Sequence, residues 1–217
     1  KRDWSSDVCS SDLKVIKMKN KIIAIVAFLV AIPTLALAQK NKVYVGAEYT
    51  KNTVDTGISV GTATLDEKDY GYSIFIGTEI DKNFDVEFSY NNFGEASLTG
   101  NNGSTFTANG TAYQFTADGA KLAAKADSFG LALKPKLTLG QNIDLVGTLG
   151  YHRWESKLSA SATNISGGSI TEDGYDFFYG IGIKANFQNF SAGLGYNIYK
   201  LDSDEVKSWG LRAAYTF

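Results

Sequence analysis

The sequence predicts an all-β protein, an eight-stranded antiparallel up-and-down transmembrane β-barrel with short periplasmic turns at one end and long extracellular loops at the other. Three observations in this chain of 217 residues lead to the prediction. Apolar and polar side chains alternate in eight segments from Val43 onward, short connections alternate with long ones, and glycines gather on the polar face. The 12 tyrosines and 13 phenylalanines, with 2 prolines, also favour strands over helices.

Each predicted strand has apolar residues at every second position, as expected of a strand with one apolar face. In the first four strands these are Val43, Val45, Ala47 and Tyr49 in 43–50, Tyr70, Tyr72, Ile74, Ile76 and Ile80 in 70–80, Val86, Phe88 and Tyr90 in 85–90, and Phe129, Leu131, Leu133, Leu137 and Leu139 in 128–139. In the last four they are Leu145, Leu149 and Tyr151 in 145–152, Tyr179, Ile181, Ile183 and Phe187 in 179–187, Leu194, Tyr196 and Ile198 in 193–198, and Trp209, Leu211, Ala213, Tyr215 and Phe217 in 208–217.

The connections between these segments fall into two kinds. Three are tight, and each has an asparagine followed by an apolar residue, as in short hairpin turns; the asparagines are Asn83, Asn142 and Asn189. The other four are polar and span 51–68, 94–127, 155–174 and 200–207. Within the second, Asn109-Gly110 predicts an extra hairpin, and within the third, Gly167-Gly168 is placed to close a hairpin that prolongs the fifth and sixth strands.

Alternation alone does not tell a soluble barrel, apolar inside, from a membrane barrel, apolar outside. A secreted lipocalin-like barrel is therefore the alternative. Glycines on the polar face favour the membrane barrel, because a narrow eight-stranded lumen needs small side chains, whereas glycine only weakens a solvent-facing sheet. Aromatic residues near the strand ends, such as Tyr44, Phe84 and Trp209, fit the interfaces of a membrane. We therefore expect the apolar face to contact lipid.

A polar face turned toward the lumen places charged side chains in a confined space, where an unpaired charge is costly. Acidic and basic residues both occur on that face, so we expect an internal ion-pair network. Its predicted members are Glu48, Glu79, Glu87, Lys134, Lys184 and Arg212. Asp85 and Lys136 lie on the same face, and the alternative for charges near the strand ends, such as these two, is that they are simply hydrated.

The segment before the barrel has the pattern of a signal peptide at residues 18–38. Lys19 and Lys21 precede an apolar run, Ile22–Ile32, which is too short for a transmembrane helix of about 20 residues. The small residues of the cleavage site and the first residue of the expected mature domain, 39–217, are Ala36, Ala38 and Gln39. We expect export through the periplasm.

Residues 1–17 are expected to be a sequencing or assembly artefact, because DWSSDVCSSDL at 3–13 resembles one reading frame of a sequencing-library adapter. Cys9 is the one cysteine of the chain, so a mature protein that begins at Gln39 would have no disulfide or thiolate chemistry. With one histidine as well, we expect no metal site and no cofactor. The chain has no basic tract, and a nucleic-acid partner is not expected.

Two stretches resemble the OmpA-like small outer-membrane β-barrels of the porin family. GYSIFIGTEIDKNFDVEFSYNNFG, Gly71–Gly94, is similar to their second and third strands, and GIGIKANFQNFSAGLGYNIY, Gly180–Tyr199, to their sixth and seventh. The resemblance implies a monomer in the outer membrane of a Gram-negative-type bacterium. The ending SWGLRAAYTF resembles the C-terminal signal that the outer-membrane assembly machinery recognises; its residues are Trp209, Leu211, Ala213, Tyr215 and Phe217.

One feature of the family is missing. In OmpA a lumen arginine on the seventh strand takes part in a charge switch proposed to gate the pore. The matching stretch here, Ser191–Gly195, has no arginine, and Lys184 stands where an acidic residue is expected. The gating mechanism is therefore not carried over to this chain.

The favoured hypothesis is a non-enzymatic surface protein, with a role in adhesion or envelope integrity, whose loops 94–127 and 155–174 meet an extracellular partner. Disordered loops without a partner are the alternative for these segments. A narrow ion-conducting pore is a second hypothesis, although eight strands leave an interior only wide enough for side chains. A lipid-modifying enzyme based on His152 is a third, but Glu155 and Ser156 are strand neighbours that point to opposite faces.

Overall fold

The computed structural model describes residues 42–108, 110–163 and 167–217. The predicted artefact (1–17) and signal peptide (18–38), with the cleavage residues Ala36, Ala38 and Gln39, lie outside the described residues. Residues from Val43 to the C-terminus form one structural unit. No helix among the described residues is long and apolar enough to cross a membrane.

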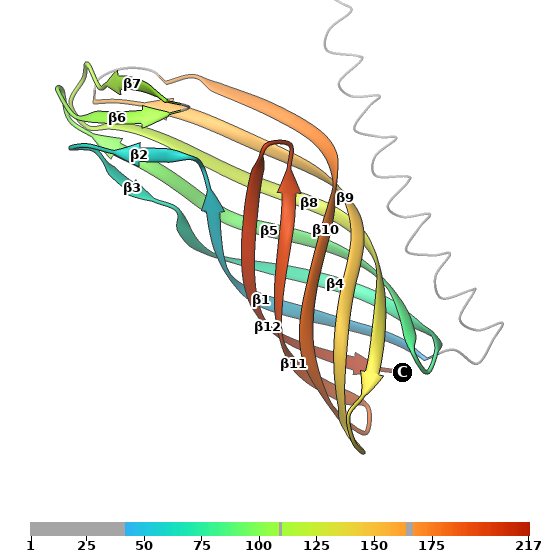
Figure 1. Ribbon diagram of the computed structural model, residues 1–217. Coiled ribbons are helices and arrows are strands. Elements are labelled where there is room, and N and C mark those ends of the chain that lie inside the picture. Colours follow the sequence, from blue (N-terminus) through green and yellow to red (C-terminus); the bar gives the residue numbers. More distant parts are fainter. Residues whose placement is uncertain (1–41, 109, 164–166) are drawn as a thin grey trace, which may run out of the picture. The chain divides into compact units, whose positions relative to one another are not determined.

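Eight long strands close into a barrel (Figure 1). They are β1 (Val43–Asp55), β4 (Lys68–Asp81), β5 (Phe84–Gly100), β8 (Ala120–Thr138), β9 (Ile143–Ser161), β10 (Ser169–Phe187), β11 (Phe190–Leu201) and β12 (Asp204–Thr216). Their order around the barrel is β5-β4-β1-β12-β11-β10-β9-β8, and β5 pairs with β8 to complete the circle. All neighbours are antiparallel. The predicted eight-stranded barrel is confirmed.

The three predicted tight turns share one hydrogen-bonding device. The main-chain carbonyls of Asn83, Asn142 and Asn189 accept N–H groups from the neighbouring strands, at N···O distances of 2.6, 2.8 and 2.7 Å. The donors are Lys136, Asn186 and Thr216. Each turn therefore continues the inter-strand ladder for one more residue, which leaves few main-chain groups without partners at this end of the barrel (the turn end).

The outer face of the barrel is apolar. Leu133 and Ile183 are 40% and 46% exposed, and Ile76 is half-buried on the same face. Near the other end of the barrel (the loop end), this face carries a ring of aromatic side chains, which are Tyr49, Tyr70, Tyr72, Phe129, Tyr151, Tyr175, Phe177 and Trp209. An apolar band edged by aromatic rings belongs to a barrel surrounded by lipid. The predicted orientation is confirmed, and the soluble-barrel alternative is wrong.

Glycines line the narrow lumen where other side chains need space. A Cβ atom at Gly150 would overlap the ring of Phe178, and one at Gly210 would overlap the carboxylate of Glu48. These two positions therefore admit no side chain while their neighbours stay in place.

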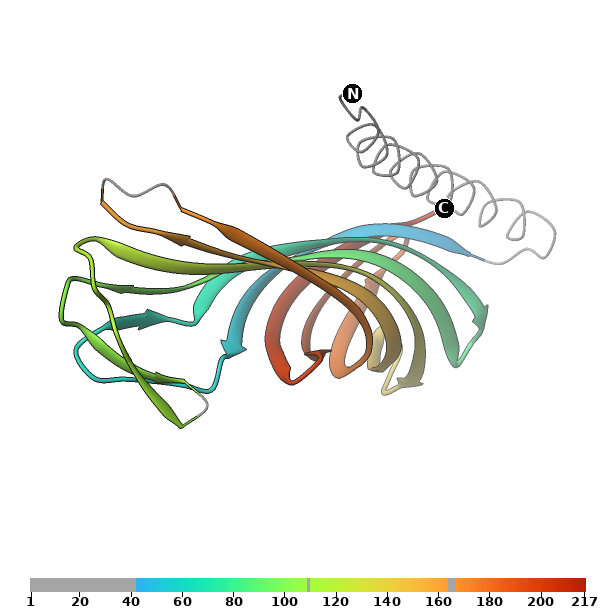
Figure 2. The same ribbon diagram turned by 90° about the horizontal axis from the view of Figure 1, so that it is seen from above.

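Four strands of the barrel continue well beyond the aromatic ring. β5, β8, β9 and β10 have 17, 19, 19 and 19 residues, whereas the other four have 12 to 14. A 19-residue strand is about 63 Å long, and about 9–11 residues cross a membrane. The part beyond the register pairs Asn92–Asp127 and Glu155–Asp173 is here called the extension. Figure 2 shows it projecting from one side of the barrel.

Four short strands complete the extension: β2 (Ile58–Val60), β3 (Thr64–Asp66), β6 (Thr105–Ala108) and β7 (Thr111–Gln114). β2, β6 and β7 form a separate three-stranded sheet, and β3 pairs with β5. A small apolar core joins these strands to β5 and β8; its buried residues are Ala63, Leu98, Phe115 and Ala120. The extension is therefore a folded structure with its own core.

Much of the two segments predicted as long loops is strand. β5 and β8 stay paired as far as Gly100 and Ala120, and β9 and β10 as far as Ser159 and Ser169. The predicted hairpin at Asn109-Gly110 is confirmed by β6 and β7, although Asn109 itself lies outside the described residues. The prolonged hairpin of the fifth and sixth strands is also confirmed. Disordered loops are therefore the wrong alternative for the described residues.

We expect Gly150→Val to destabilise the barrel by about 2 kcal/mol, because the new side chain overpacks the lumen against Phe178. The measurement is urea unfolding in lipid vesicles, followed by tryptophan fluorescence. Gly140→Val is the matched control, since Gly140 lies in a turn with open space around its Cβ position. Equal destabilisation by the two variants would contradict the packing argument.

Candidate functional site

Arg212 of β12 lies at the centre of a charged cluster in the lumen. Its guanidinium contacts the carboxylate of Glu87 at 2.5 Å and that of Glu48 at 3.8 Å. The same guanidinium lies 3.9 Å from the ring centroid of Phe75, a cation–π contact. Lys134 donates a hydrogen bond to the other oxygen of Glu87 at 2.8 Å. Two cations therefore share two carboxylates in a space from which water is largely excluded.

A second charged cluster lies nearer the turn end. Lys136 contacts Asp85 at 2.6 Å and Glu79 at 3.7 Å. Lys184 lies 4.0 Å from Asp85 and 3.6 Å from Asp144. Asp85 is 3% exposed. The alternative that Asp85 and Lys136 are merely hydrated is therefore wrong, because β5 and β8 hold them against each other on the lumen side.

The structure brings the six predicted lumen residues into these two clusters, but not in one network. Glu48, Glu87, Lys134 and Arg212 form the first cluster, whereas Glu79 and Lys184 belong to the second and do not pair with each other. Asp144, which the sequence reading did not place in the network, holds Lys184 and also accepts hydrogen bonds from Thr138 and Asn186. A functional role for these residues stays a prediction.

A hydrophobic cluster fills the lumen nearer the loop end. It consists of Phe93, Ala132, Trp154, Phe178, Tyr199, Leu201 and Val206, all at most 8% exposed. The rings of Phe178 and Tyr199 are stacked with centroids 5.0 Å apart, and Phe93 packs against Tyr199 at 4.8 Å. We call this cluster the aromatic plug. With the ion pairs below it, the plug leaves little room in the lumen for a continuous water column.

His152 belongs to the wall of the aromatic plug. Its ring lies 5.5 Å from the rings of both Phe178 and Tyr199, and it is 1% exposed. Nε2 lies 2.8 Å from the main-chain oxygen of Lys200, which makes Nε2 the protonated nitrogen and the donor. No described serine, cysteine or carboxylate hydrogen-bonds to this ring. The arrangement is that of a packed histidine rather than a catalytic base.

The aromatic plug was not predicted from the sequence, because the lumen face was expected to carry only polar and small side chains. Phe178 alternates in phase with Gly180 and Gly182, and Tyr199 with Asn197 and Gly195. Continuing each strand's alternation past the aromatic ring would have placed both rings inside. No group of three His, Cys, Asp or Glu residues in the described part of the chain is arranged to hold a metal ion.

The C-terminal residues predicted as an assembly signal all lie on the outer face of β12. Trp209, Leu211, Tyr215 and Phe217 are 37–74% exposed, and Ala213 is exposed between them. They form one continuous apolar stripe that contacts no lumen residue. Recognition of this stripe by assembly machinery stays a prediction.

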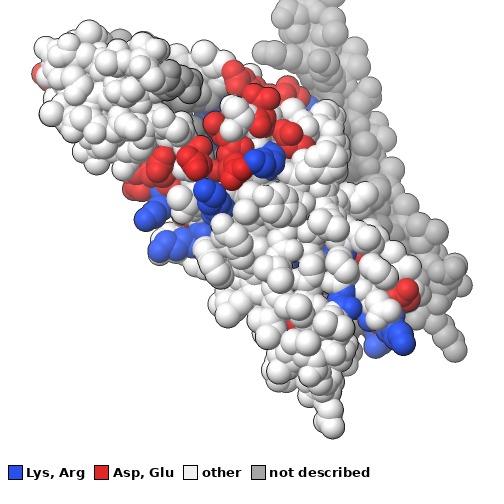
Figure 3. All heavy atoms as spheres, viewed as in Figure 1, with Lys and Arg blue, Asp and Glu red and all other residues white. Residues whose placement is uncertain are grey.

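The loop end carries most of the net charge. Residues 51–69, 92–127, 153–176 and 200–207, which lie beyond the aromatic ring, contain fourteen Asp and Glu but eight Lys and Arg. Figure 3 shows acidic side chains gathered near the loop ends of β11 and β12. Asp204 and the three acidic residues whose charges act on it, Asp55, Glu172 and Asp202, are here called the acidic rim.

The acidic rim is strongly coupled. Partial burial, and then the neighbouring carboxylates of Asp202, Asp55 and Glu172, raise the pKa of Asp204. Lys207 pairs with Asp55 at 3.2 Å. No Lys or Arg among the described residues forms an ion pair with Glu172, Asp202 or Asp204. The rim therefore has an excess of negative charge, with three carboxylates that no described Lys or Arg pairs with.

We expect Glu87→Gln to lower the free energy of unfolding by about 3 kcal/mol, because it leaves Lys134 and Arg212 buried together with Glu48 as their one nearby carboxylate. Urea unfolding in vesicles measures the change. Glu205→Gln, which removes a surface partner of Lys200, is the control and should have little effect. If the two variants were equally stable, the lumen ion pairs would not hold the barrel together.

The chain matches the family model described as "Outer membrane protein beta-barrel domain" over residues 22–217. It is 26% identical over 165 residues to the attachment invasion locus protein of Yersinia enterocolitica, covering 75% of this chain and 86% of that protein. The crystal structure of Ail from Yersinia pestis in complex with the heparin analogue sucrose octasulfate aligns at a TM-score of 0.51 and 18% identity. A structure of Ail without the analogue aligns at 0.50. Both cover 82% of this chain and 99% of theirs.

The match to the family model covers most of the chain and agrees with the closed antiparallel barrel, the apolar outer band and the aromatic ring. The apolar band therefore lies in the bilayer, and the extension is on the extracellular side, opposite the tight periplasmic turns. This protein belongs to the outer membrane protein beta-barrel domain family and resides in the bacterial outer membrane.

Proposed function

We propose that this protein is a non-enzymatic surface-interaction protein of the adhesion type, and that the extension binds an extracellular protein partner. The observation that carries the proposal is the extension itself, a folded sheet with its own core beyond the lipid. A barrel that only reinforced the envelope would gain nothing from strands so much longer than the bilayer requires.

The extension has an open edge at β10. This strand pairs with β9 from Ser169 to Ala185, but with β11 only from Phe178 onward. Along 169–177, therefore, no strand of the described chain lies on the other side of β10. An edge of this kind presents a row of main-chain donors and acceptors to which an extended segment of another protein can add a strand. The run SITEDGYDF contains neither Lys nor Pro, and its charged residues, Glu172, Asp173 and Asp176, are all acidic.

The relatives support a surface role and narrow the choice of partner. The Yersinia enterocolitica relative is named for attachment and invasion, which supports adhesion for this chain as well. The Yersinia pestis relative was crystallised with a sulfated, strongly anionic compound. Here the extracellular part has fourteen acidic and eight basic residues, which repels polyanions. We therefore propose a protein partner rather than a sulfated polysaccharide.

Neither remaining hypothesis is supported by a specific contact. The aromatic plug closes the lumen near the loop end, and the two charged clusters leave a cavity of only about 70 Å³ below it, which does not favour an ion-conducting pore. His152 is packed between two rings and bound to a main-chain oxygen, which does not favour a lipid-modifying enzyme.

Shortening the extension tests the proposal. A variant lacking 95–125 and 156–172, with a two-residue Asn-Gly turn at each cut, keeps the barrel strands in register up to Asn92–Asp127 and Glu155–Asp173. We expect cells that display the full protein, but not the shortened one, to enrich binders from a library of random twelve-residue peptides. Folding of both is checked by migration on an unheated SDS gel. Equal enrichment would contradict a binding role for the extension.

The edge itself is tested by two neighbouring prolines, Thr171→Pro and Glu172→Pro. Adjacent N–H groups of a strand point to opposite sides, so one proline removes a donor to β9 and the other a donor to the open edge. We expect one variant to unfold the tip of β10 and the other to leave the fold intact while binding of the selected peptides falls at least tenfold. Undiminished peptide binding by the folded variant would exclude edge pairing.

A further inference from the structure

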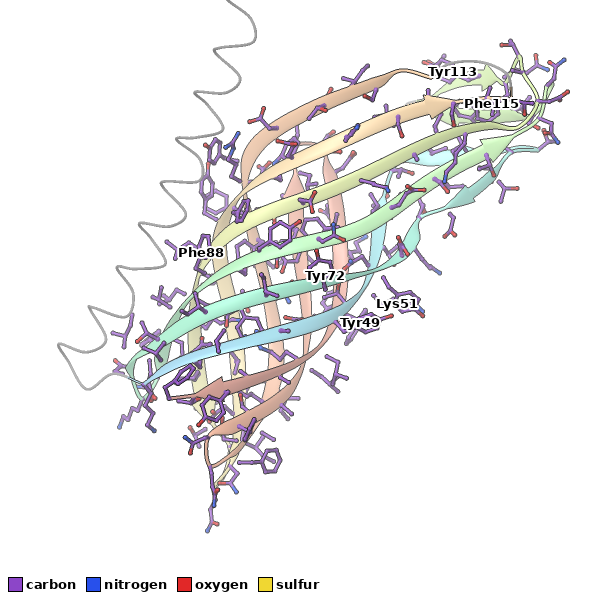
Figure 4. All side chains as sticks on the ribbon, turned by 180° about the vertical axis from the view of Figure 1, so that it is seen from behind. Tyr49, Lys51, Tyr72, Phe88, Tyr113 and Phe115 are labelled. Atoms are coloured by element: carbon purple, nitrogen blue, oxygen red, sulfur yellow. The ribbon has the colours of Figure 1, made fainter. Side chains whose placement is uncertain are left out.

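The inner face of the extension contains an apolar groove with a volume of about 390 Å³. Side chains from β2, β3, β5, β6, β8 and β9 line it, chiefly Ile58, Leu65, Leu98, Phe106, Leu122 and Leu158. Figure 4 shows Tyr113, which also lines the groove, with Phe115 at the far end of the extension. A groove of this size and composition is typical of a binding site.

Part of the groove is exposed to water. Leu158 and Tyr113 are 47% and 50% exposed, and Ile170, the register partner of Leu158, is 64% exposed. The exposed groups lie above the aromatic ring, so lipid does not cover them. Contiguous apolar surface on an otherwise polar extracellular structure marks a place where another molecule binds.

The acidic rim adjoins this groove at Asp55, and another of its members, Glu172, lies on β10 beside the groove-lining strand β9. Asp55 precedes Thr56, which lines the groove and donates a hydrogen bond to Glu67 at 2.6 Å. Glu172 lies two residues from Ile170 on β10, and therefore on the same face of the sheet. Asp204 lies close enough to Asp55 and Glu172 for their carboxylates to raise its pKa. The groove and the acidic rim therefore adjoin each other at the end of β1, where Asp55 precedes Thr56.

We propose that the groove and the acidic rim together bind an extracellular polypeptide segment in which apolar side chains adjoin Lys or Arg side chains. The apolar side chains occupy the groove between β2, β6, β8 and β9. The basic side chains neutralise Glu172, Asp202 and Asp204, which have no ion-pair partner among the described residues. Charge complementarity therefore selects a cationic partner, and the groove selects one with an apolar part.

This chemistry excludes two other occupants. A fatty acyl chain would fill the groove but would leave the carboxylates of the rim uncompensated. A sulfated polysaccharide would be repelled by the rim and has no apolar side chain for the groove. The site binds through side chains and the edge of β10 through main-chain groups, and Glu172 is the residue of the acidic rim that lies on that edge. Either proposal can therefore fail without the other.

The test uses a fluorescent seven-residue peptide of three Leu, one Gly and three Lys, with the protein in nanodiscs of zwitterionic lipid. One control peptide has Ser in place of Leu, and the other has Glu in place of Lys. Empty nanodiscs correct for binding to lipid. We expect the parent peptide to bind at least tenfold more tightly than either control, and its affinity to fall as salt is raised.

Three variants locate the bound peptide. Leu158→Gln changes the groove, and Asp202→Asn with Asp204→Asn removes two charges from the rim. The φ angle of 58° at Asp202 suits asparagine equally well. Glu155→Gln with Asp127→Asn removes the same charge from a register pair outside the rim. We expect the first two variants to weaken binding at least fivefold and the third to leave it unchanged.

Several results would overturn the inference, provided that each variant migrates as the folded form on an unheated SDS gel. Equal binding of the Ser peptide would show that the groove is not used, and equal binding of the Glu peptide that the rim is not. Unchanged binding by Leu158→Gln or by the double rim variant would lead to the same conclusion. Loss of binding in Thr171→Pro alone, which keeps the Glu172 carboxylate, would assign the peptide to the edge and not to the groove.

Discussion

Every main-chain N–H and C=O group that lies in lipid must find a hydrogen-bond partner within the protein, and the whole architecture follows from this constraint. The pairing of β5 with β8 closes the sheet and removes both edges from the bilayer. Above the lipid, water can satisfy the same groups. There β10 extends nine residues beyond its pairing with β11, so that one edge of β10 is unpaired. Closed edges in lipid and an open edge in water are two results of one rule.

Closure with eight strands also fixes what the lumen can contain. Large rings and charged side chains fit only because glycines such as Gly150 and Gly210 have no side chain and so leave room for Phe178 and Glu48. The charges are confined and must pair, so acidic and basic groups are nearly balanced on the lumen side and at the turns. The interior is therefore a core held together by ion pairs and packed rings, comparable to the core of a soluble protein, and not an open channel.

The sequence was sufficient for the barrel because alternation carries through every strand that touches lipid. It was insufficient above the lipid, where small and charged residues such as Ala, Ser and Lys in β8 and β9 weaken the alternation, so that the predicted strands are too short. β2 and β3, of three residues each, give no periodic signal. The alternation along each strand was enough to predict which charged residues face the lumen. Their partners depend on the register between strands, which places Lys136 rather than Lys184 beside Glu79.

The distribution of charge links the fold to the proposed binding. Because the lumen must be nearly neutral, a surplus of negative charge can only be carried outside the bilayer, and the extracellular residues carry it. A surplus placed on a projecting sheet acts at a distance: it draws cationic partners toward the extension and slows the approach of anionic ones. Two barrels of this family can therefore share one fold and still select partners of opposite charge, since the lipid-embedded strands place no restriction on the charge of the extension.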